Sequence, residues 1–165
     1  MFETDLSRRS LLGAGAIAAA GATFALRAAP AVAAAGRFEI SYTPAEWRRR
    51  LGPDRFRILR QKGTEAPYSS PLDKQRRSGT YACAGCGLPL FASSTKFDSG
   101  TGWPSFYAAL PNAVRTRRDS DLGMVRVEEH CRRCGGHLGH VFDDGPPPTG
   151  KRHCINGLAL QFRPA

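Results

Sequence analysis

Two Cys-x-x-Cys-Gly elements are the strongest chemical signal in the sequence. They read Cys83-Ala-Gly-Cys86-Gly and Cys131-Arg-Arg-Cys134-Gly. Two such pairs bring four thiolates within tetrahedral reach of one divalent ion, and the glycine after each pair allows a turn with positive φ. Because protein would fill every coordination position, the sequence predicts a closed, structural zinc site. Two disulfides, or a redox-active pair at either element, are the alternatives.

A fifth cysteine, Cys154, lies in the segment 152–162 near the C-terminus. In a strand, alternation would place Arg152, Cys154 and Asn156 on one face, continued by apolar residues. The thiol would then lie at the edge of the core, with Arg152 available to favour the thiolate. This segment alone fits a nucleophile and an inert core cysteine equally well.

His137 and His140 follow the second cysteine pair closely. Residues three apart in a regular strand face opposite sides, so both imidazoles reach one pocket only if Gly139 marks a bulge or kink. Around a nucleophilic cysteine they would serve as base and acid. Purely structural histidines are one alternative. Zinc ligation is another, which is disfavoured because four cysteines already saturate one ion.

A glycine-rich run at 96–106 presents a tryptophan. Gly100 and Gly102 suit a tight loop, and the apolar face of Trp103 would line a pocket for a methyl or thioether group. A buried structural tryptophan is the alternative interpretation.

The elements that position these residues follow from length and composition. A chain of 165 residues with 18 Gly and 12 Pro predicts one domain with many turns and short strands, and 41% apolar residues exclude a disordered chain. The sequence Thr43-Pro-Ala-Glu46 is a capping box, so a helix begins there, breaks at Gly52-Pro53 and ends before Gly63. Strands are predicted at 38–42, 80–83, 88–91, 124–130, 137–142 and 153–162.

The first 35 residues are interpreted as a signal peptide outside this domain. Arg8 and Arg9 precede an Ala/Gly-rich apolar run that ends in small residues, a pattern typical of twin-arginine export signals. Ala33 and Ala35 both suit cleavage. An uncleaved membrane anchor is the alternative, but the run is short and weakly apolar for a span of about 20 residues. The predicted domain is then 36–165.

A basic charge belongs to the domain itself. Without residues 1–35 the chain keeps 21 of its 24 basic and 12 of its 14 acidic residues, a net charge of +9. A zinc-ribbon module that binds nucleic acid would fit this charge. An exported protein rarely meets nucleic acid, so a solvated basic surface with no nucleic-acid partner is the preferred interpretation.

The ordered motifs resemble those of the methionine-R-sulfoxide reductases of the B type, over about residues 43–163. These motifs are Gly63-Thr-Glu-Ala-Pro-Tyr68, both cysteine elements, the run 96–106, His137-Leu-Gly-His140-Val-Phe142, Asp144-Gly-Pro, Pro148-Thr-Gly-x-Arg152 and Cys154-Ile-Asn156. The resemblance implies a mainly β fold of two antiparallel sheets in a tent arrangement, with short N-terminal helices and a structural zinc site away from the active centre.

The resemblance also implies roles for individual residues. Cys154 corresponds to the catalytic thiol and Trp103 to the wall that receives the sulfoxide methyl. The polar catalytic residues around the thiol are His137, His140 and Asn156. The supporting substrate-binding residues are Phe142 and Arg152.

The implied chemistry suits these residue types. A sulfoxide becomes a good electrophile when its oxygen is protonated, and imidazole, with an unperturbed pKa near 6.5, is a suitable donor. Cys154 would attack the sulfur, His137 or His140 would donate the proton, and Asn156 would hold that network. Methionine would leave, with Cys154 as a sulfenic acid.

Two positions depart from the family pattern. Thr101 stands where many members carry a second, resolving cysteine, so the expected reductant is an external thiol such as a thioredoxin-like protein. Gly157 stands where serine is common, which we expect to matter little.

Partners and location follow from the same interpretation. We expect a periplasmic monomer that uses the twin-arginine export machinery and acts on oxidised methionine in exported proteins. A zinc-containing peroxide sensor that uses Cys154 without a methionine substrate is the remaining alternative.

Overall fold

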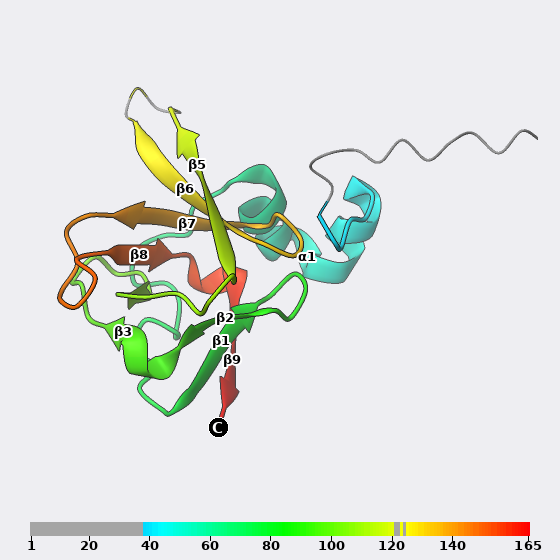
Figure 1. The fold of residues 1–165 in the computed structure, drawn as a ribbon. Coiled ribbons are helices and arrows are strands. Elements are labelled where there is room, and N and C mark those ends of the chain that lie inside the picture. The colour runs from blue at the N-terminus through cyan, green and yellow to red at the C-terminus, as the bar shows by residue number, and fades with distance from the viewer. Residues whose placement is uncertain (1–37, 121–122, 124) are drawn as a thin grey trace, which may run out of the picture. The chain divides into compact units, whose positions relative to one another are not determined.

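Residues 38–120, 123 and 125–165 are described by the computed structural model of the chain (Figure 1). The signal predicted at 1–35 lies outside them, as does Met124 at the start of one predicted strand. Among the residues described, no helix is both long enough and apolar enough to cross a membrane.

Helix α1 (Pro44–Gln61) begins at the predicted capping box. Thr43 N–H donates to Glu46 Oε2 at 2.9 Å, and Glu46 N–H donates to Thr43 Oγ1 at 3.3 Å. Gly52 has non-helical backbone angles, φ 71° and ψ 173°, so this range consists of two short helical segments that meet at the predicted break. Trp47 and Phe56 are buried on its inner face.

The strand predicted at 38–42 is wrong, because this segment pairs with no strand. Instead it lies against the second cysteine loop. Ile40 N–H donates to Arg133 O at 3.1 Å, and the Phe38 ring meets His130 edge-on at 5.8 Å. Apolar alternation here therefore reflects packing on a loop.

The strands form two sheets in which every pairing is antiparallel, as predicted. The smaller sheet has the order β2-β1-β9 and the larger the order β3-β4-β8-β7-β6-β5. The strands are β1 (Gly79–Cys83), β2 (Pro89–Ala92), β3 (Lys96–Phe97), β4 (Ser105–Phe106), β5 (Val114–Asp119), β6 (Arg126–Cys131), β7 (His137–Phe142), β8 (Arg152–Ile155) and β9 (Leu160–Pro164).

The strand predicted at 153–162 is divided between the sheets. A 3-10 turn, η3 (Gly157–Ala159), carries the chain from β8 in the larger sheet to β9 in the smaller. The face of the strand predicted to carry Arg152, Cys154 and Asn156 together with apolar residues therefore ends at Asn156. A Cβ at Gly157 would lie 1.9 Å from Ser70 Oγ, so the serine that is common at this position in the family would require Ser70 to move.

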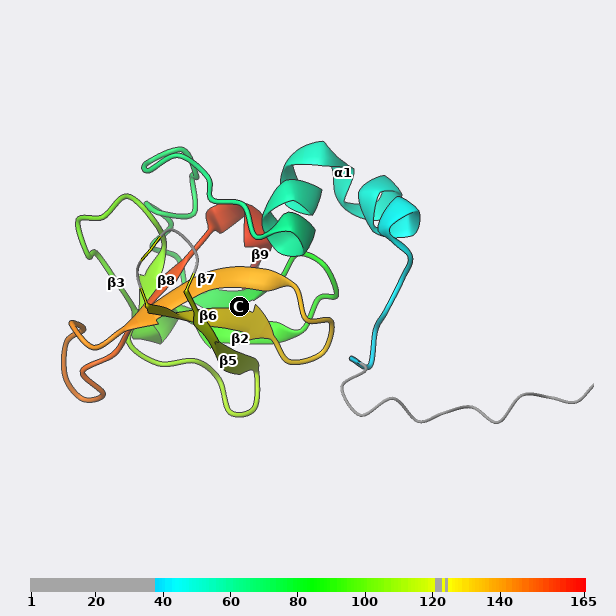
Figure 2. The same cartoon turned by 90° about the horizontal axis from the view of Figure 1, so that it is seen from above.

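Aromatic rings link the two sheets. Phe91 of β2 stacks on Phe106 of β4 with ring centroids 4.4 Å apart, and Tyr81 of β1 meets Phe106 edge-on at 4.9 Å. All three side chains are fully buried. Helix α1 packs against β7 and η3 (Figure 2). This packing fixes β4 and β7, the two strands that flank β8.

Candidate functional site

Cys154 lies on β8, in the interior of the larger sheet. Its cross-strand neighbours are Ser105 on β4 and His140 on β7. Gly139 allows this close approach, because a Cβ there would lie only 2.0 Å from Cys154 O. The glycine that the sequence marked as a kink is thus required by the strand carrying the thiol.

A hollow of about 150 Å³ opens beside Cys154. Five of its lining residues were predicted as site residues: Cys154, His140, Asn156, Trp103 and Phe142. Three others were not predicted as site residues: Thr64, Arg126 and Gly139. Two predicted residues, His137 and Arg152, do not line it. A larger hollow of about 630 Å³, bounded in part by Glu65 and Gly157, contains neither cysteine nor histidine. The chemistry-bearing side chains therefore converge on the smaller one.

Hydroxyl groups approach the Cys154 sulfur from the loop before β4. Thr101 Oγ1 lies 3.9 Å from Cys154 Sγ, and Ser99 Oγ lies 2.8 Å from both Thr101 Oγ1 and Ser105 Oγ. Burial raises the pKa of the Cys154 thiol, while Thr101 and Arg152 favour the thiolate and only partly offset this. Arg152 thus acts in the predicted direction, but the thiol form prevails at neutral pH.

Arg152 supports the site from behind Phe142. Its Nε and Nη2 donate to the two carboxylate oxygens of Asp144, each at 2.8 Å. Its guanidinium lies over the Phe142 ring, 4.4 Å from the centroid, and the two residues are cross-strand neighbours. The bidentate pair with Asp144 therefore fixes the Arg152 guanidinium, which packs on Phe142, one wall of the hollow.

His140 is held by a carboxylate from the edge of the sheet. Its Nε2 lies 2.7 Å from Asp119 Oδ2, which also accepts from Arg126 Nη2 at 3.1 Å. Asp119 is buried. A carboxylate at this distance assigns the proton of the neutral ring to Nε2, which leaves Nδ1 as the nitrogen able to exchange a proton with a bound molecule.

His137 is held in the same way but lies deeper. A bulge in the β6–β7 pairing, at the predicted place, brings its ring centroid to 5.5 Å from that of His140. Its Nδ1 lies 2.9 Å from Glu128 Oε1, and its Nε2 is buried with no hydrogen-bond partner among the described residues. Burial lowers the pKa of His137 despite the carboxylate, which favours the neutral ring.

Glu128 is a fully buried anion with several cationic partners. Arg117 donates to it from Nε at 2.6 Å and from Nη2 at 2.8 Å, and Lys62 Nζ lies 3.3 Å away. Burial opposes its ionisation, but the hydrogen bonds from Arg117 and His137 outweigh burial and lower the pKa of Glu128 to about 2. Glu128 therefore stays ionised and keeps the proton of His137 on Nδ1.

Asn156 bonds to neither imidazole. Its Oδ1 accepts from Glu65 N–H at 3.0 Å, and its Nδ2 donates to Leu138 O at 3.0 Å. Trp103, across the hollow, donates from Nε1 to Glu65 O at 3.2 Å. The predicted contact between Asn156 and the histidines is thus replaced by contacts with Glu65 and β7.

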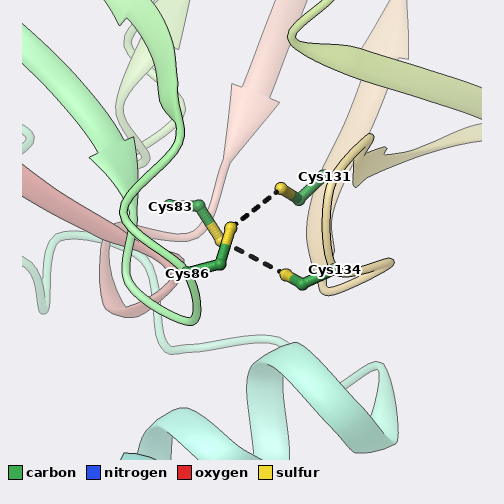
Figure 3. A group of neighbouring side chains, drawn as sticks. All are labelled: Cys83, Cys86, Cys131 and Cys134. Atoms are coloured by element: carbon green, nitrogen blue, oxygen red, sulfur yellow. Dashed lines mark hydrogen bonds between the residues drawn. The ribbon is translucent and has the colours of Figure 1, made fainter. Parts of the chain in front are cut away.

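The four remaining cysteines form a separate cluster (Figure 3). Their sulfur atoms all lie within 4.8 Å of one another, and Cys83–Cys134 and Cys86–Cys131 are separated by 3.7 and 3.5 Å. These separations exceed the roughly 2.05 Å of a disulfide and match the edge of about 3.8 Å expected for a tetrahedral site with Zn–S near 2.3 Å. The cluster joins the loops after β1 and β6 and can hold one metal ion.

The sequence patterns did not predict three acidic residues of the site. Asp119 and Glu128 hold the histidines, and the Glu65 carbonyl accepts from Trp103. Asp119 and Glu128 are buried acids in strands, a signal that is informative because unpaired buried charge is costly. Glu65 stands in the Gly63-Thr-Glu-Ala-Pro-Tyr68 motif, to which no role was given.

Comparison with known protein sequences identifies a family and several relatives. Residues 51–164 match the SelR domain. The chain is 58% identical over 123 residues to the peptide methionine sulfoxide reductase MsrB of Thiobacillus denitrificans, covering 74% of this chain and 93% of that protein. It is 52% identical over 127 residues to the MsrB of Agrobacterium fabrum, covering 76% and 94%. For the MsrB of Methanosarcina barkeri the identity is 54% over 119 residues, covering 72% and 84%. The chain therefore belongs to the SelR-domain family, together with these MsrB proteins.

Proposed function

We propose that this chain is a peptide-methionine (R)-S-oxide reductase that acts on oxidised methionine in proteins. The observation that carries this proposal is the hollow in which the Cys154 thiol faces an apolar wall, Trp103 and Phe142, and an imidazole, His140. The apolar wall suits the methyl and methylene groups of methionine sulfoxide. The imidazole suits its oxygen.

The proposed step transfers one oxygen atom between two sulfurs. Attack of the Cys154 sulfur on the sulfoxide sulfur forms an S–S bond. The S–O bond of the substrate and this S–S bond then break, methionine leaves, and the oxygen is bonded to the Cys154 sulfur as a sulfenic acid. The thiol gives up its proton and the product oxygen carries one, so the step needs no net proton. Methionine is reduced by two electrons and Cys154 is oxidised by two.

We assign proton donation to His140. It lines the hollow, and the Asp119 carboxylate holds its Nε2 and so leaves Nδ1 for the sulfoxide oxygen. His137 is disfavoured as the donor, because burial lowers its pKa so that less of the ring is protonated, and because it does not line the hollow. Its position behind His140 suits a role in holding water or orienting the second ring.

Reduction of the sulfenic acid needs an external thiol in this proposal. One thiol condenses with Cys154–SOH and releases water, and a second thiol frees Cys154 as the donor becomes a disulfide. Thr101, 3.9 Å from the sulfur, occupies the place from which an internal cysteine would act. Thr101→Cys should therefore replace a trappable sulfenic acid by a 101–154 disulfide, visible as the loss of the trap adduct in intact mass.

Zinc is the metal we propose for the cysteine cluster. Four cysteine sulfurs at tetrahedral spacing suit zinc, and they leave no position for a substrate. The metal would therefore stabilise the fold, and none of the four sulfurs lines the hollow beside Cys154.

Export by the twin-arginine route remains a proposal that rests on Arg8, Arg9 and the apolar run behind them. It would deliver a folded, zinc-loaded monomer to the periplasm. Replacing both arginines by lysine should leave the precursor in the cytoplasm, and normal export of that variant would contradict the assignment.

Turnover of separated methionine sulfoxide epimers tests the function. With dithiothreitol as reductant, we expect reduction of the R epimer in peptides and little reduction of the S epimer. Oxidation of Cys154 by peroxide without turnover of either epimer would instead indicate a sensor. Equal turnover of both epimers would contradict a pocket that selects by shape.

A further inference from the structure

The segment between α1 and β1 bridges the two halves of the candidate site. It contains Glu65, which is 5% exposed although it lies outside every helix and strand. On one side lies Trp103, in the loop before β4. On the other lies Asn156, which follows the strand of Cys154. Both side chains line the same hollow.

The main chain of Glu65 joins these two side chains directly. Its N–H donates to Asn156 Oδ1 at 3.0 Å, and its carbonyl accepts from Trp103 Nε1 at 3.2 Å. A shift of this one residue therefore changes the position of Trp103 relative to the turn that follows Cys154.

The Glu65 carboxylate anchors that main chain. Its two oxygens accept from Gly157 N–H at 2.5 Å and Leu158 N–H at 2.9 Å, the first amides of η3. Charge-assisted hydrogen bonds of this kind are about twice as strong as neutral ones. The side chain thus ties the segment to the turn directly behind β8.

Tyr68 fastens the same segment to the tryptophan loop. Its N–H donates to Gly102 O and its hydroxyl to Gly100 O, each at 2.7 Å. Gly102 has a φ of 87°, and a Cβ there would lie 2.8 Å from Tyr68 N. Glu65 and Tyr68 together therefore hold the part of the loop, residues 100–103, that carries Trp103.

We propose that Glu65 is a positioning residue that sets the distance between the Trp103 wall and the Cys154 thiol. The inference rests on the proposed function, because it assigns to Trp103 the contact with the sulfoxide methyl. The Glu65 side chain neither lines the hollow nor touches the sulfur. It affects the site by fixing the Glu65 main chain, which bonds to Trp103 and Asn156. Misplacement of a bound group by about 1 Å can cost about 100-fold in rate.

The decisive variant is Glu65→Gln, studied with metal bound. An amide keeps the size of the side chain but cannot accept from both amides of η3 with the strength of a carboxylate. We expect kcat/KM for methionine-R-sulfoxide to fall about 10- to 100-fold. Alkylation of Cys154 by iodoacetamide should be unchanged, because the contacts of Thr101 and Arg152 with the thiol remain.

The indole N–H resonances provide a readout that does not depend on turnover. The chain has two tryptophans, and their signals can be assigned with Trp103→Phe. In Glu65→Gln the Trp103 signal should move and exchange its proton faster, while the Trp47 signal stays. Glu46→Gln is the matched control, since Glu46 also bonds to a backbone amide, that of Thr43, but lines no part of the hollow.

Two results would overturn the proposal. One is wild-type kcat/KM in Glu65→Gln, whether or not the Trp103 signal moves, and the other is a fall in kcat/KM with the Trp103 signal unmoved. If Glu65→Gln does not fold, Tyr68→Phe decides, because Tyr68 is 62% exposed and loses only its hydroxyl. A smaller fall in kcat/KM with a moved Trp103 signal is then expected, and wild-type values of both would overturn the proposal. Failure of the proposed function is a separate result, since the wild-type protein would reduce neither epimer.

Discussion

The cysteine cluster and the Cys154 site use the same side chain in two different surroundings. In the cluster, four sulfurs from the ends of β1 and β6 and from the loops that follow them lie within 4.8 Å of one another. Cys154 instead contacts the hydroxyl of Thr101 and lies beside an open hollow with an imidazole. A sulfur surrounded by sulfurs suits a metal ion, and a sulfur beside a hollow suits a substrate. The neighbours supplied by other strands therefore decide what each cysteine can do.

Replacing Cys154 is the most direct way to distinguish the role of the Cys154 site from that of the cysteine cluster. We expect Cys154→Ser to abolish reduction of methionine-R-sulfoxide, because a hydroxyl is a far weaker nucleophile, and to keep bound metal and wild-type melting. Turnover and zinc content measured on the same preparation check this. Residual turnover near the wild-type rate would remove Cys154 from the proposed mechanism.

Removing a cluster sulfur should have the opposite pattern. Cys134→Ser should lose zinc and cooperative unfolding together, because structural zinc contributes an apparent binding free energy of about 10–16 kcal/mol, comparable to the stability of a whole domain. Thermal unfolding with and without a chelator is the measurement. A zinc-free protein that melts as the wild type does would show that the cluster does not depend on metal.

The two histidines allow a finer test within the open site. His140→Ala should slow formation of the sulfenic acid by about 10²- to 10⁴-fold, the usual range for a general acid. His137→Ala should slow it less, because burial already disfavours the protonated form of that ring. Single-turnover trapping of the sulfenic acid measures both. A larger loss in His137→Ala would reverse our assignment of the donor.

The smallest expected effect concerns the pH dependence of the thiol. Burial raises the pKa of Cys154, so alkylation by iodoacetamide should still be rising at the ordinary pKa of a thiol, about 8.5. Thr101→Val removes a hydroxyl that favours the thiolate, so the profile should move to higher pH. A profile that levels off well below neutral pH in the wild type would contradict the effect of burial.

Local features of the fold were predictable from sequence because their causes are local. The capping box at Thr43, the kink at Gly52 and the turns of the cysteine pairs depend on a few adjacent residues. The spacing of the two histidines also identified Gly139 as the position where a bulge would be needed to bring both rings to one side. Cys154, His140 and Trp103 became candidates for a different reason, through their residue types and the resemblance of the ordered motifs to a known family.

Features that depend on distant partners were not predictable in this way. Alternation continues through 152–162, so nothing in the pattern marks the turn at Gly157, where the chain leaves one sheet for the other. The carboxylates of Asp119 and Glu128 reach the histidines only after β5, β6 and β7 have paired. The two-residue strands β3 and β4 are too short to carry any periodic signal.

The position of β8 has a consequence for how the protein is made. This strand lies between β4 and β7, yet it is the second-last strand along the chain. During synthesis the facing edges of β4 and β7 stay unpaired until residues 152–155 leave the ribosome, and unpaired edges favour association with other chains. The thiol reaches its neighbours only when β8 has paired. A truncated chain that ends before residue 152 therefore lacks both a completed sheet and the reactive centre.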